Sequence, residues 1–456
     1  MLYPSTTGAS IDILSTQGNN SSSSLVSRAS DPVTETSFSS ASSSLSVAPL
    51  VVESVRAHSS GLNQQTVEPV GRLQLANDNT STAPGFSIAD LSLINRTAIA
   101  QVRFIKSLQL TNGAIEESTQ NPVVYTRDLS LAALALARSG SVQGAGRSIE
   151  FLLSLPQNSS SYTGPGGTHY SSPPAWDQVY STVGAPLDPS LRGEDQGMAL
   201  LAISSYIQAA HNTSMALKSW GKIESSANYI VYLQNTPESG ELNHVGLYRH
   251  GDNWHDTRQE NLANGSSPIY WPYWPEYYQW EEENMRMILG MRGAIWLAQD
   301  LGFSADVRAW NASVSAAIVG LDNEWMYSKY EAYDYFGSVL WGLQNNTQAA
   351  REMLASMPQG FFTSSYGVKD LPWLGLTAAS DTIDYMMCLA RVQNYTGASL
   401  FLHTLTTKFE NPQGGFYDTI NLQNLSPSPV SMVYSSARFV YFSYVVFNGE
   451  GPAPSQ

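Results

Sequence analysis

The segment "YYQWEEENMRM", residues 277–287, places three consecutive glutamates between an aromatic stretch and an apolar run. Only 13% of the chain is charged, so such a cluster needs an explanation. Acidic residues favour the first turn of a helix, because they offset its macrodipole and bind its free N–H groups. The alternative interpretation is that one of these carboxyls transfers a proton in a reaction, which would require a second carboxyl elsewhere in the chain.

Carboxylates recur wherever a long loop enters an apolar stretch. They are Asp128, Glu194 with Asp195, Glu281 to Glu283, Asp334 and Asp381. Each one alone is explained by the preference of acids for helix starts. If the apolar helices run parallel, however, these starts converge at one end and form an anionic floor there.

The elements that must position these carboxylates are helical. Apolar stretches such as "DLSLAALALA" and "MALLAISSYI" alternate with amphipathic ones such as "SWGKIESSANYIVYLQ", a pattern typical of buried helices paired with partly exposed ones. We predict twelve helices, at 86–109, 127–138, 141–155, 194–210, 213–234, 281–300, 304–321, 332–344, 347–356, 380–393, 396–409 and 430–446.

These helices form six hairpins, which predicts an all-α protein with the buried helices in a closed inner ring. A helical solenoid is the competing arrangement. The loops entering the buried helices are long (157–193, 235–280, 357–379 and 410–429) and the turns leaving them are short. Function is therefore expected at the end of the ring that carries the long loops.

The aromatic run "YWPYWPEYYQW", residues 270–280, lies directly before the glutamates and has seven aromatic residues. Aromatic faces stack on the apolar faces of sugar rings, while carboxylates and arginines bind the hydroxyls. Pro272 and Pro275 exclude a regular helix, so these rings are on a loop. The run either binds a carbohydrate or only covers the end of the barrel.

Four short motifs resemble the glucoamylase-like family of inverting glycoside hydrolases over about residues 90–447. They are "VVYTRDLSLAALALARSG", "LRGEDQGMALLAI", "YYQWEEENM" and "GGFYDTIN". A fifth segment, "VYSSARF", follows the last motif and resembles the family's final helix. The resemblance implies an (α/α)6 barrel of six helical hairpins, and an exo-acting enzyme that cleaves α-linked glucosides without metal or organic cofactor.

The same resemblance implies roles for particular residues. Arg127 and Asp128 match the pair that grips the terminal sugar, with Tyr125 in place of the usual tryptophan. Trp280, Glu281 and Glu282 match the segment that carries the general acid, which is Glu281. Glu194 and Asp195 match a further substrate-binding segment loosely, because an amide is usual at the first position. The negative charges of Glu282 and Glu283 would help Glu281 to keep its proton, since adjacent negative charge raises the pKa of a carboxyl.

The main departure concerns the catalytic base. The family has a glutamate in the last long loop, whereas this chain offers Asp418, and no glutamate lies between Glu410 and Glu450. Aspartate is one methylene shorter, and a misplacement of about 1 Å costs about a hundredfold in rate.

Composition restricts the partners. The formal net charge is −15, from 38 acidic and 23 basic residues, which argues against nucleic acid or an anionic membrane as partner. Cys388 is the only cysteine, and without a Cys/His cluster we expect no zinc site. The loop "YRHGDNWHD", residues 248–256, is interpreted as polar rather than metal-binding. We expect a monomer that acts on an oligo- or polysaccharide.

Residues 1–84 are rich in Ser, Thr, Asn and Gln, as in "SFSSASSSLS". Such composition buries too little apolar surface to offset the entropy of ordering, so we predict a disordered or low-complexity segment before a barrel at 85–450. Frequent Asn-x-Ser/Thr triplets favour an extracellular or cell-surface protein, although the N-terminus has no clear signal peptide.

Two other function classes stay open at this stage. One is a different (α/α)6 carbohydrate enzyme, such as a hydrolase or lyase acting on uronic acids. A lyase would need basic residues for the uronate carboxylate, and an acidic floor argues against it. The other is a non-catalytic glycan-binding barrel that has lost its base, for which Asp418 is the chief argument.

Overall fold

The computed structural model describes residues 85–163, 168–236, 247–248, 251–252, 281–324, 332–344, 346–363, 365–370, 372 and 375–447. The N-terminal segment 1–84 and the aromatic run 270–280 lie outside these residues, so the predictions made for them stay predictions. No helix among the described residues is long and apolar enough to cross a membrane.

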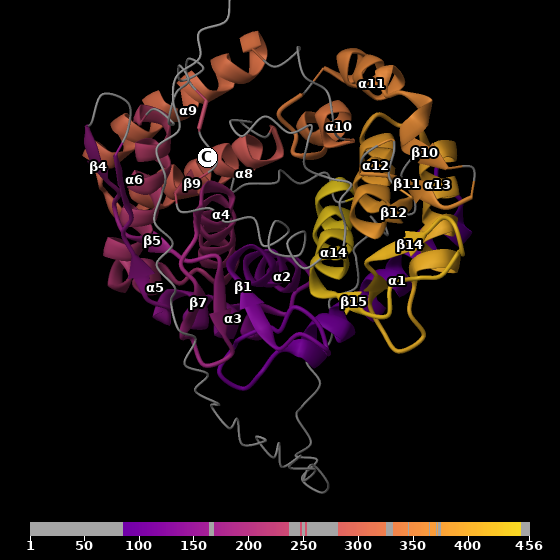
Figure 1. Ribbon diagram of the computed structural model, residues 1–456, viewed down its shortest axis with the longest axis horizontal. Coiled ribbons are helices and arrows are strands. Elements are labelled where there is room, and N and C mark those ends of the chain that lie inside the picture. The colour runs from indigo at the N-terminus through magenta and orange to yellow at the C-terminus, as the bar shows by residue number, and fades with distance from the viewer. Residues whose placement is uncertain are drawn as a thin grey trace, which may run out of the picture. The chain divides into compact units, whose positions relative to one another are not determined.

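Six helices form a closed inner ring (Figure 1). Each packs on the next, and the last packs on the first, which excludes a solenoid. They are α2 (Thr126–Arg138), α4 (Gly193–Ala210), α8 (Glu281–Leu301), α10 (Tyr333–Leu340), α12 (Ala379–Arg391) and α14 (Val433–Phe447). In α4 every residue from Gly193 to Ile207 is buried, including the acids Glu194 and Asp195 of its first turn. The predicted all-α (α/α)6 barrel is confirmed.

The remaining α-helices of the described residues pack around this ring. They are α1 (Ile88–Leu108), α3 (Val142–Ser154), α5 (Thr213–Lys218), α6 (Trp220–Asn235), α9 (Ser304–Glu324), α11 (Thr347–Ser356) and α13 (Tyr395–Thr404). The outer helix α1 packs on the inner helix α14, so the two ends of the described chain together supply the sixth helix pair.

Three predicted helices differ in extent from the observed ones. The helix expected at 213–234 is divided at Ser219 into α5 and α6. The helix expected at 332–344 ends at Leu340, where Gly342 adopts φ 69° and turns the chain out of the helix. The helix expected at 396–409 ends at Thr404 and continues as the π-helical turn η4 (Leu405–Phe409).

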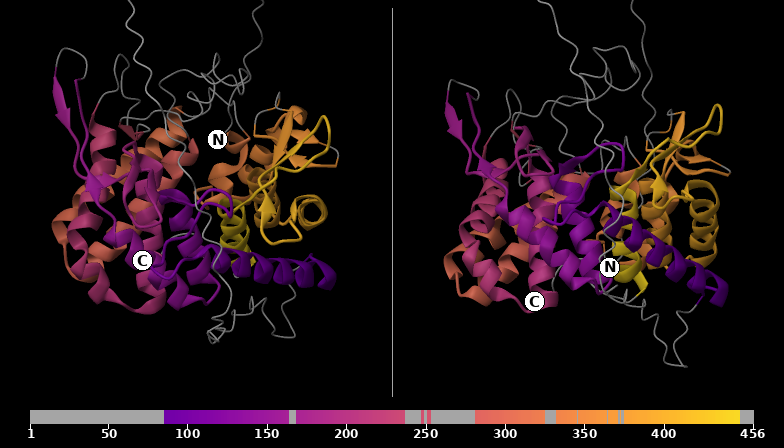
Figure 2. Two further views of the ribbon diagram at one scale, coloured as in Figure 1. Left: turned by 60° about the horizontal axis from the view of Figure 1, so that its bottom comes forward. Right: turned by 90° about the horizontal axis from the view of Figure 1, so that it is seen from below.

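Short antiparallel strands hold the long loops at the end of the barrel where the inner helices begin, called here the loop end. Figure 2 shows them gathered toward one end of the helices. In the first half of the barrel, β1 (Val123–Tyr125) pairs with β6 (Val179–Ser181), and β6 also pairs with β7 (Pro186–Asp188). The other pairs there are β2 (Gln157–Asn158) with β5 (Ala175–Trp176), β3 (Ser161–Thr163) with β4 (His169–Ser171), and β8 (Leu191–Arg192) with β9 (Gly251–Asp252). In the second half, the short 3-10 helix η3 (Gln359–Phe361) precedes the pair β10 (Phe362–Thr363) and β11 (Gly367–Val368), and the remaining pairs are β12 (Leu376–Ala378) with β14 (Thr419–Asn421) and β13 (Phe416–Tyr417) with β15 (Ser431–Met432).

Side chains of the inner helices fasten these loops to the ring. The Gln196 side chain on α4 bonds both the N–H and the carbonyl of Trp176, at 3.0 and 2.8 Å. Asn284 on α8 does the same to Tyr248, at 2.9 and 3.1 Å. All four residues are buried, so each amide satisfies backbone groups that water cannot reach.

Candidate active site at the loop end of the barrel

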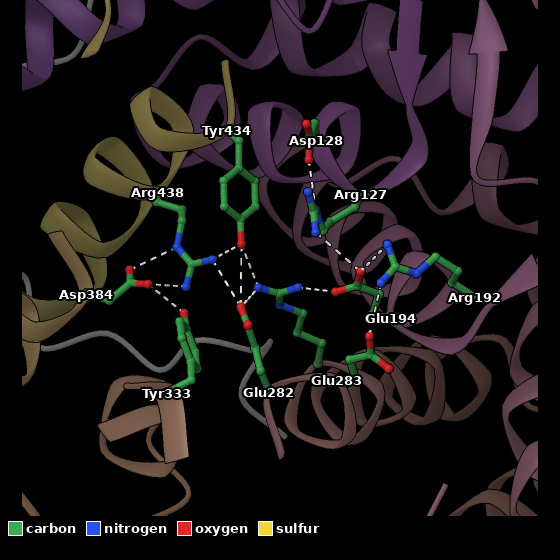
Figure 3. A network of polar contacts seen from close by, with 11 residues as sticks. Arg127, Asp128, Arg192, Glu194, Glu282, Glu283, Tyr333, Asp384, Tyr434 and Arg438 are labelled. Atoms are coloured by element: carbon green, nitrogen blue, oxygen red, sulfur yellow. Dashed lines mark hydrogen bonds and ion pairs between the residues drawn. The ribbon is translucent and has the colours of Figure 1, made fainter. Parts of the chain in front are cut away.

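Each of the six inner helices contributes a side chain from its start to one polar network. Eleven residues, called here the ring network, take part: Arg127, Asp128, Arg192, Glu194, Glu282, Glu283, Arg286, Tyr333, Asp384, Tyr434 and Arg438 (Figure 3). Arg192 immediately precedes α4, and the other ten lie in the first two turns of their helices. Since the helices run parallel in a ring, these turns meet at the loop end.

Glu194 is the centre of one half of the network. Its Oε1 atom lies 3.3 Å from Nη1 of Arg127 and 3.1 Å from Nη1 of Arg192, while Oε2 pairs with Arg286. The Glu194 side chain is only 2% exposed. A carboxylate buried to this extent is stable as an anion only because guanidinium groups surround it.

Glu282 is the centre of the other half. Its Oε1 atom pairs with Arg286 and lies 3.2 Å from Nη1 of Arg438. The Tyr434 hydroxyl donates to the same oxygen at 3.5 Å. Arg286 therefore connects the two centres, because it pairs with both Glu194 and Glu282.

The far side of the network is fully buried. Arg438 Nε donates to Oδ1 of Asp384 at 2.9 Å, and the Tyr333 hydroxyl donates to Oδ2 at 2.6 Å. The Asp384 side chain is 0% exposed and that of Arg438 2%. These residues thus join α10, α12 and α14 beneath the surface and hold the helix starts together.

The predicted anionic floor is wrong for this network. Five carboxylates face four guanidinium groups, so most of the negative charge is neutralised within the network. Glu282 and Glu283 were expected to help Glu281 keep its proton by like charge. Glu282 pairs with Arg286 and Arg438, and Glu283 lies 3.3 Å from Arg192, so this repulsion is largely cancelled.

Three charged members of the network are partly exposed at the surface, and they are called here the exposed edge. The side chains of Arg127, Glu282 and Arg192 are 28%, 17% and 15% exposed, whereas those of the other charged members are at most 4% exposed. A guanidinium donates hydrogen bonds and a carboxylate accepts them. This edge can therefore bind groups that both donate and accept, as hydroxyls do.

Asp128 supports Arg127 within this edge. Its Oδ1 atom accepts from Nε of Arg127 at 2.9 Å, and the aspartate is 2% exposed. The α2 N-terminus is fixed from outside, because Thr126 donates from its amide to the Gln178 carbonyl at 3.0 Å and from its hydroxyl to the Asp177 carbonyl at 2.6 Å. The predicted pair thus lies side by side at a firmly held helix start.

Asp418 also lies at the loop end, between β13 and β14. Its carbonyl accepts from the amide of Ala379, the first residue of α12, at 2.8 Å. Its charge helps to raise the pKa of Asp381, whose shift comes first from burial. Glu281 is the first residue of α8 and so starts at the same end, although its side chain and Trp280 are outside the described part of the chain.

Asp195 and Tyr125 flank Asp128 and Arg127. Burial raises the pKa of Asp195 well above its usual range, and Arg192 opposes this shift. Its Oδ2 atom is buried without a hydrogen-bond partner among the described residues. Burial, with the charges of Glu117 and Asp128, raises the pKa of Tyr125 to about 12. Tyr125 therefore stays neutral and can act as a hydrogen-bond donor.

Glu117 is a carboxyl of this region that the sequence did not reveal. Its carbonyl accepts from the amide of Val433, the first residue of α14, at 2.9 Å. Its half-buried side chain accepts from Asn121. Burial, and then the nearby charge of Asp128, raises its pKa to about 7, with Asp418 adding to the shift. It stands in an unremarkable loop, "GAIEES", so no pattern indicated it.

Five other members of the ring network were not predicted as site residues, although they lie in or close to segments that the sequence analysis singled out. Arg192, Arg286, Tyr434 and Arg438 stand inside or beside the motifs "LRGEDQG", "EEENMR" and "VYSSARF". Asp384 follows the predicted Asp381 by three residues, which places it one helical turn further into the barrel. No group of three or more metal-binding side chains occurs among the described residues.

Comparison with known proteins gives the fold a context. No protein-family model matches the sequence, and no curated protein matches it. A solved glycosidase is similar with a TM-score of 0.58 at 13% identity, covering 81% of this chain and 100% of its own. A glycosidase variant in complex with glucose gives a TM-score of 0.56 at the same identity and coverage.

A cellobiose 2-epimerase from Bacillus thermoamylovorans is also similar, with a TM-score of 0.54 at 11% identity over 77% of this chain and 99% of its own. At such identities the likeness concerns the fold alone. This chain shares the fold of glycosidases and sugar epimerases built as (α/α)6 barrels.

Proposed function

We propose that this protein is a carbohydrate-active enzyme, and specifically an exo-acting, inverting glycoside hydrolase of α-linked glucosides. The observation that carries the proposal is the convergence of all six inner helix starts on one charged site. Its surface edge offers the donors and acceptors that sugar hydroxyls need.

The reaction would proceed in a single displacement. Glu281 gives its proton to the leaving oxygen, and Asp418 takes a proton from the water that attacks the anomeric carbon from the opposite face. The position of Asp418 at the end where α8 begins supports this assignment. A base at the other end of the barrel would have excluded it.

The remaining residues would bind the sugar. Arg127, Glu282 and Trp280 contact hydroxyls and ring faces directly, and Asp128 and Tyr125 support Arg127. Glu194 is 2% exposed and held by three arginines, so we assign it to holding Arg127 rather than to contacting the sugar. Asp195, which is 1% exposed, would act from beneath the same edge.

A second candidate is a sugar 2-epimerase. Epimerisation removes and returns a proton beside a carbonyl, which works best with a group whose pKa is near the working pH. Glu117, with a pKa of about 7, meets that requirement at the same end of the barrel.

Proton NMR of reaction mixtures distinguishes these functions. Maltose, isomaltose, trehalose and starch should be incubated with the full chain, and cellobiose and polygalacturonate should be included as alternatives. An inverting hydrolase releases β-glucose first from an α-glucoside. An epimerase in D₂O leaves the linkage intact and incorporates deuterium at C2. A uronate-acting enzyme consumes only polygalacturonate, and binding without any product indicates a non-catalytic barrel.

A further inference from the structure

We propose that Tyr434 is a positioning residue with two separable functions: its ring holds Arg127 toward the substrate, and its hydroxyl holds Glu282. Arg127 and Glu282 are the two most exposed charged groups of the ring network. The functional part of this inference rests on the proposed function, in which both residues bind the sugar.

The ring of Tyr434 lies under three guanidinium groups. The Cζ atoms of Arg127, Arg438 and Arg286 are 4.4, 4.8 and 6.0 Å from its centroid. Arg127 is the closest and by far the most exposed, at 28% against 2% for the other two. A guanidinium stacked on an aromatic face keeps a fixed plane, so the ring fixes the direction in which Arg127 offers its remaining N–H groups.

The hydroxyl of Tyr434 uses its hydrogen-bonding capacity fully. It accepts from Nη2 of Arg286 at 2.7 Å and from Arg438, and it donates to Glu282 at 3.5 Å. A phenol has one donor and acceptor capacity for two partners. The hydroxyl therefore separates two like-charged guanidinium groups and orients the carboxylate between them.

These contacts also explain why the residue is a tyrosine. Tyr434 belongs to α14, whereas Arg127 belongs to α2 and Glu282 to α8 (Figure 3). Phenylalanine would supply the stacking surface without a partner for Arg286, and a shorter polar residue would reach neither helix. One side chain thus contacts both Arg127 and Glu282, the two most exposed charged residues of the network.

The two functions predict different kinetic effects. Tyr434→Phe keeps the ring that holds Arg127, so KM should stay within about twofold. Glu282 adjoins the proposed acid Glu281, and without the Tyr434 hydroxyl it can shift against the reacting sugar, so kcat should fall about tenfold. Tyr434→Leu removes the ring as well and should in addition raise KM about tenfold. Tyr441→Phe, the same change two turns further along α14, is the matched control for loss of a hydroxyl. Circular dichroism checks folding, and Tyr434→Met replaces the leucine variant if that variant does not fold.

A mutant cycle with Arg127→Lys tests the coupling. Lysine keeps the charge but not the planar stack, so the KM effects of Arg127→Lys and Tyr434→Leu should be non-additive. If the fold-changes in KM of the two single variants simply multiply in the double variant, the two residues act independently and the proposal is overturned. An unchanged KM in Tyr434→Leu would overturn it as well.

A second measurement does not depend on catalysis. In a sample labelled with ¹⁵N-arginine, the Nε–Hε resonance that disappears in Arg127→Lys belongs to Arg127. It should carry an upfield ring-current shift in the wild type and in Tyr434→Phe, and lose it in Tyr434→Leu. An unmoved resonance contradicts the stacking. If the wild type processes no sugar, the proposed function fails, while this spectrum still decides whether Tyr434 positions Arg127.

Discussion

Gly290 on α8 lies directly against Gly197 on α4. A Cβ atom added to Gly290 would come within 2.2 Å of the Gly197 carbonyl oxygen, which real structures do not tolerate. The two glycines allow the helices to approach so closely that Arg286 reaches Glu194 across the contact. The distance between these helices therefore sets the geometry of the ring network.

Gly290→Ala should destabilise the protein and weaken the site. Overpacking costs about 1–3 kcal/mol, and the better helix propensity of alanine, about 1 kcal/mol, offsets this only in part. Thermal unfolding followed by circular dichroism measures the effect. Gly221→Ala on α6 is the matched control, because nothing lies within 4 Å of the added Cβ. Equal melting temperatures for the two variants would show that the contact is not tight.

Asp128→Asn should weaken substrate binding more than it weakens the fold. The substitution removes the charge that pairs with Arg127 while keeping the size of the side chain. We expect KM to rise about tenfold, since a hydrogen bond between charged groups contributes about 1.5–3 kcal/mol. A variant that loses stability but binds maltose as well as the wild type would assign Asp128 to helix capping alone.

Glu281→Gln removes the proposed proton donor. Turnover of maltose should fall by about 10²–10⁴-fold, the usual contribution of general acid catalysis. Glucosyl fluoride needs little protonation of its leaving group, so this substrate should recover much of the rate. Comparable losses on both substrates would contradict the assignment of Glu281 as acid.

Asp418 variants test the proposed base. Asp418→Asn cannot accept the proton of water, and glucosyl fluoride should not restore its activity. Asp418→Glu restores the family's side chain but lengthens it by one methylene. Because the Asp418 carbonyl is already tied to Ala379, we expect the added length to displace the carboxyl and to lower kcat by about a hundredfold. Unchanged kcat in Asp418→Asn would exclude it as base.

Glu117→Gln should stabilise the protein more at pH 8 than at pH 5. The ordinary pKa of the carboxyl is 4.5, and in the folded protein it is about 7. Between these values the folded state binds more protons than the unfolded state, so the wild type loses stability as the pH rises through this window. Glutamine carries no such charge, and its advantage should therefore grow with pH.

Melting temperatures at both pH values check this prediction. Glu116→Gln removes the same formal charge one residue earlier and controls for a general effect of net charge. A Glu117→Gln advantage that does not depend on pH would show that the burial and negative neighbours of Glu117 do not control its ionisation.

The sequence by itself determined most of the helices and the class of fold, but not the short strands of the loops. Apolar stretches such as that of α4, polar partners such as α6 and long loops at one end predicted the paired helices, because helical periodicity is a local property. It also predicted that the acids Asp128, Glu194 and Glu282 meet at one end, since the starts of parallel helices converge there, and the family resemblance added Arg127 beside them.

The tertiary structure alone decided how the charges are shared. Whether Glu194 is a free acid or the partner of three arginines depends on side chains from α2, α4 and α8 meeting across the ring. Glu117 and Asp418 likewise acquire their surroundings from loops that are far apart in the chain. Burial and pairing depend on distances in space, and no spacing along the sequence encodes them.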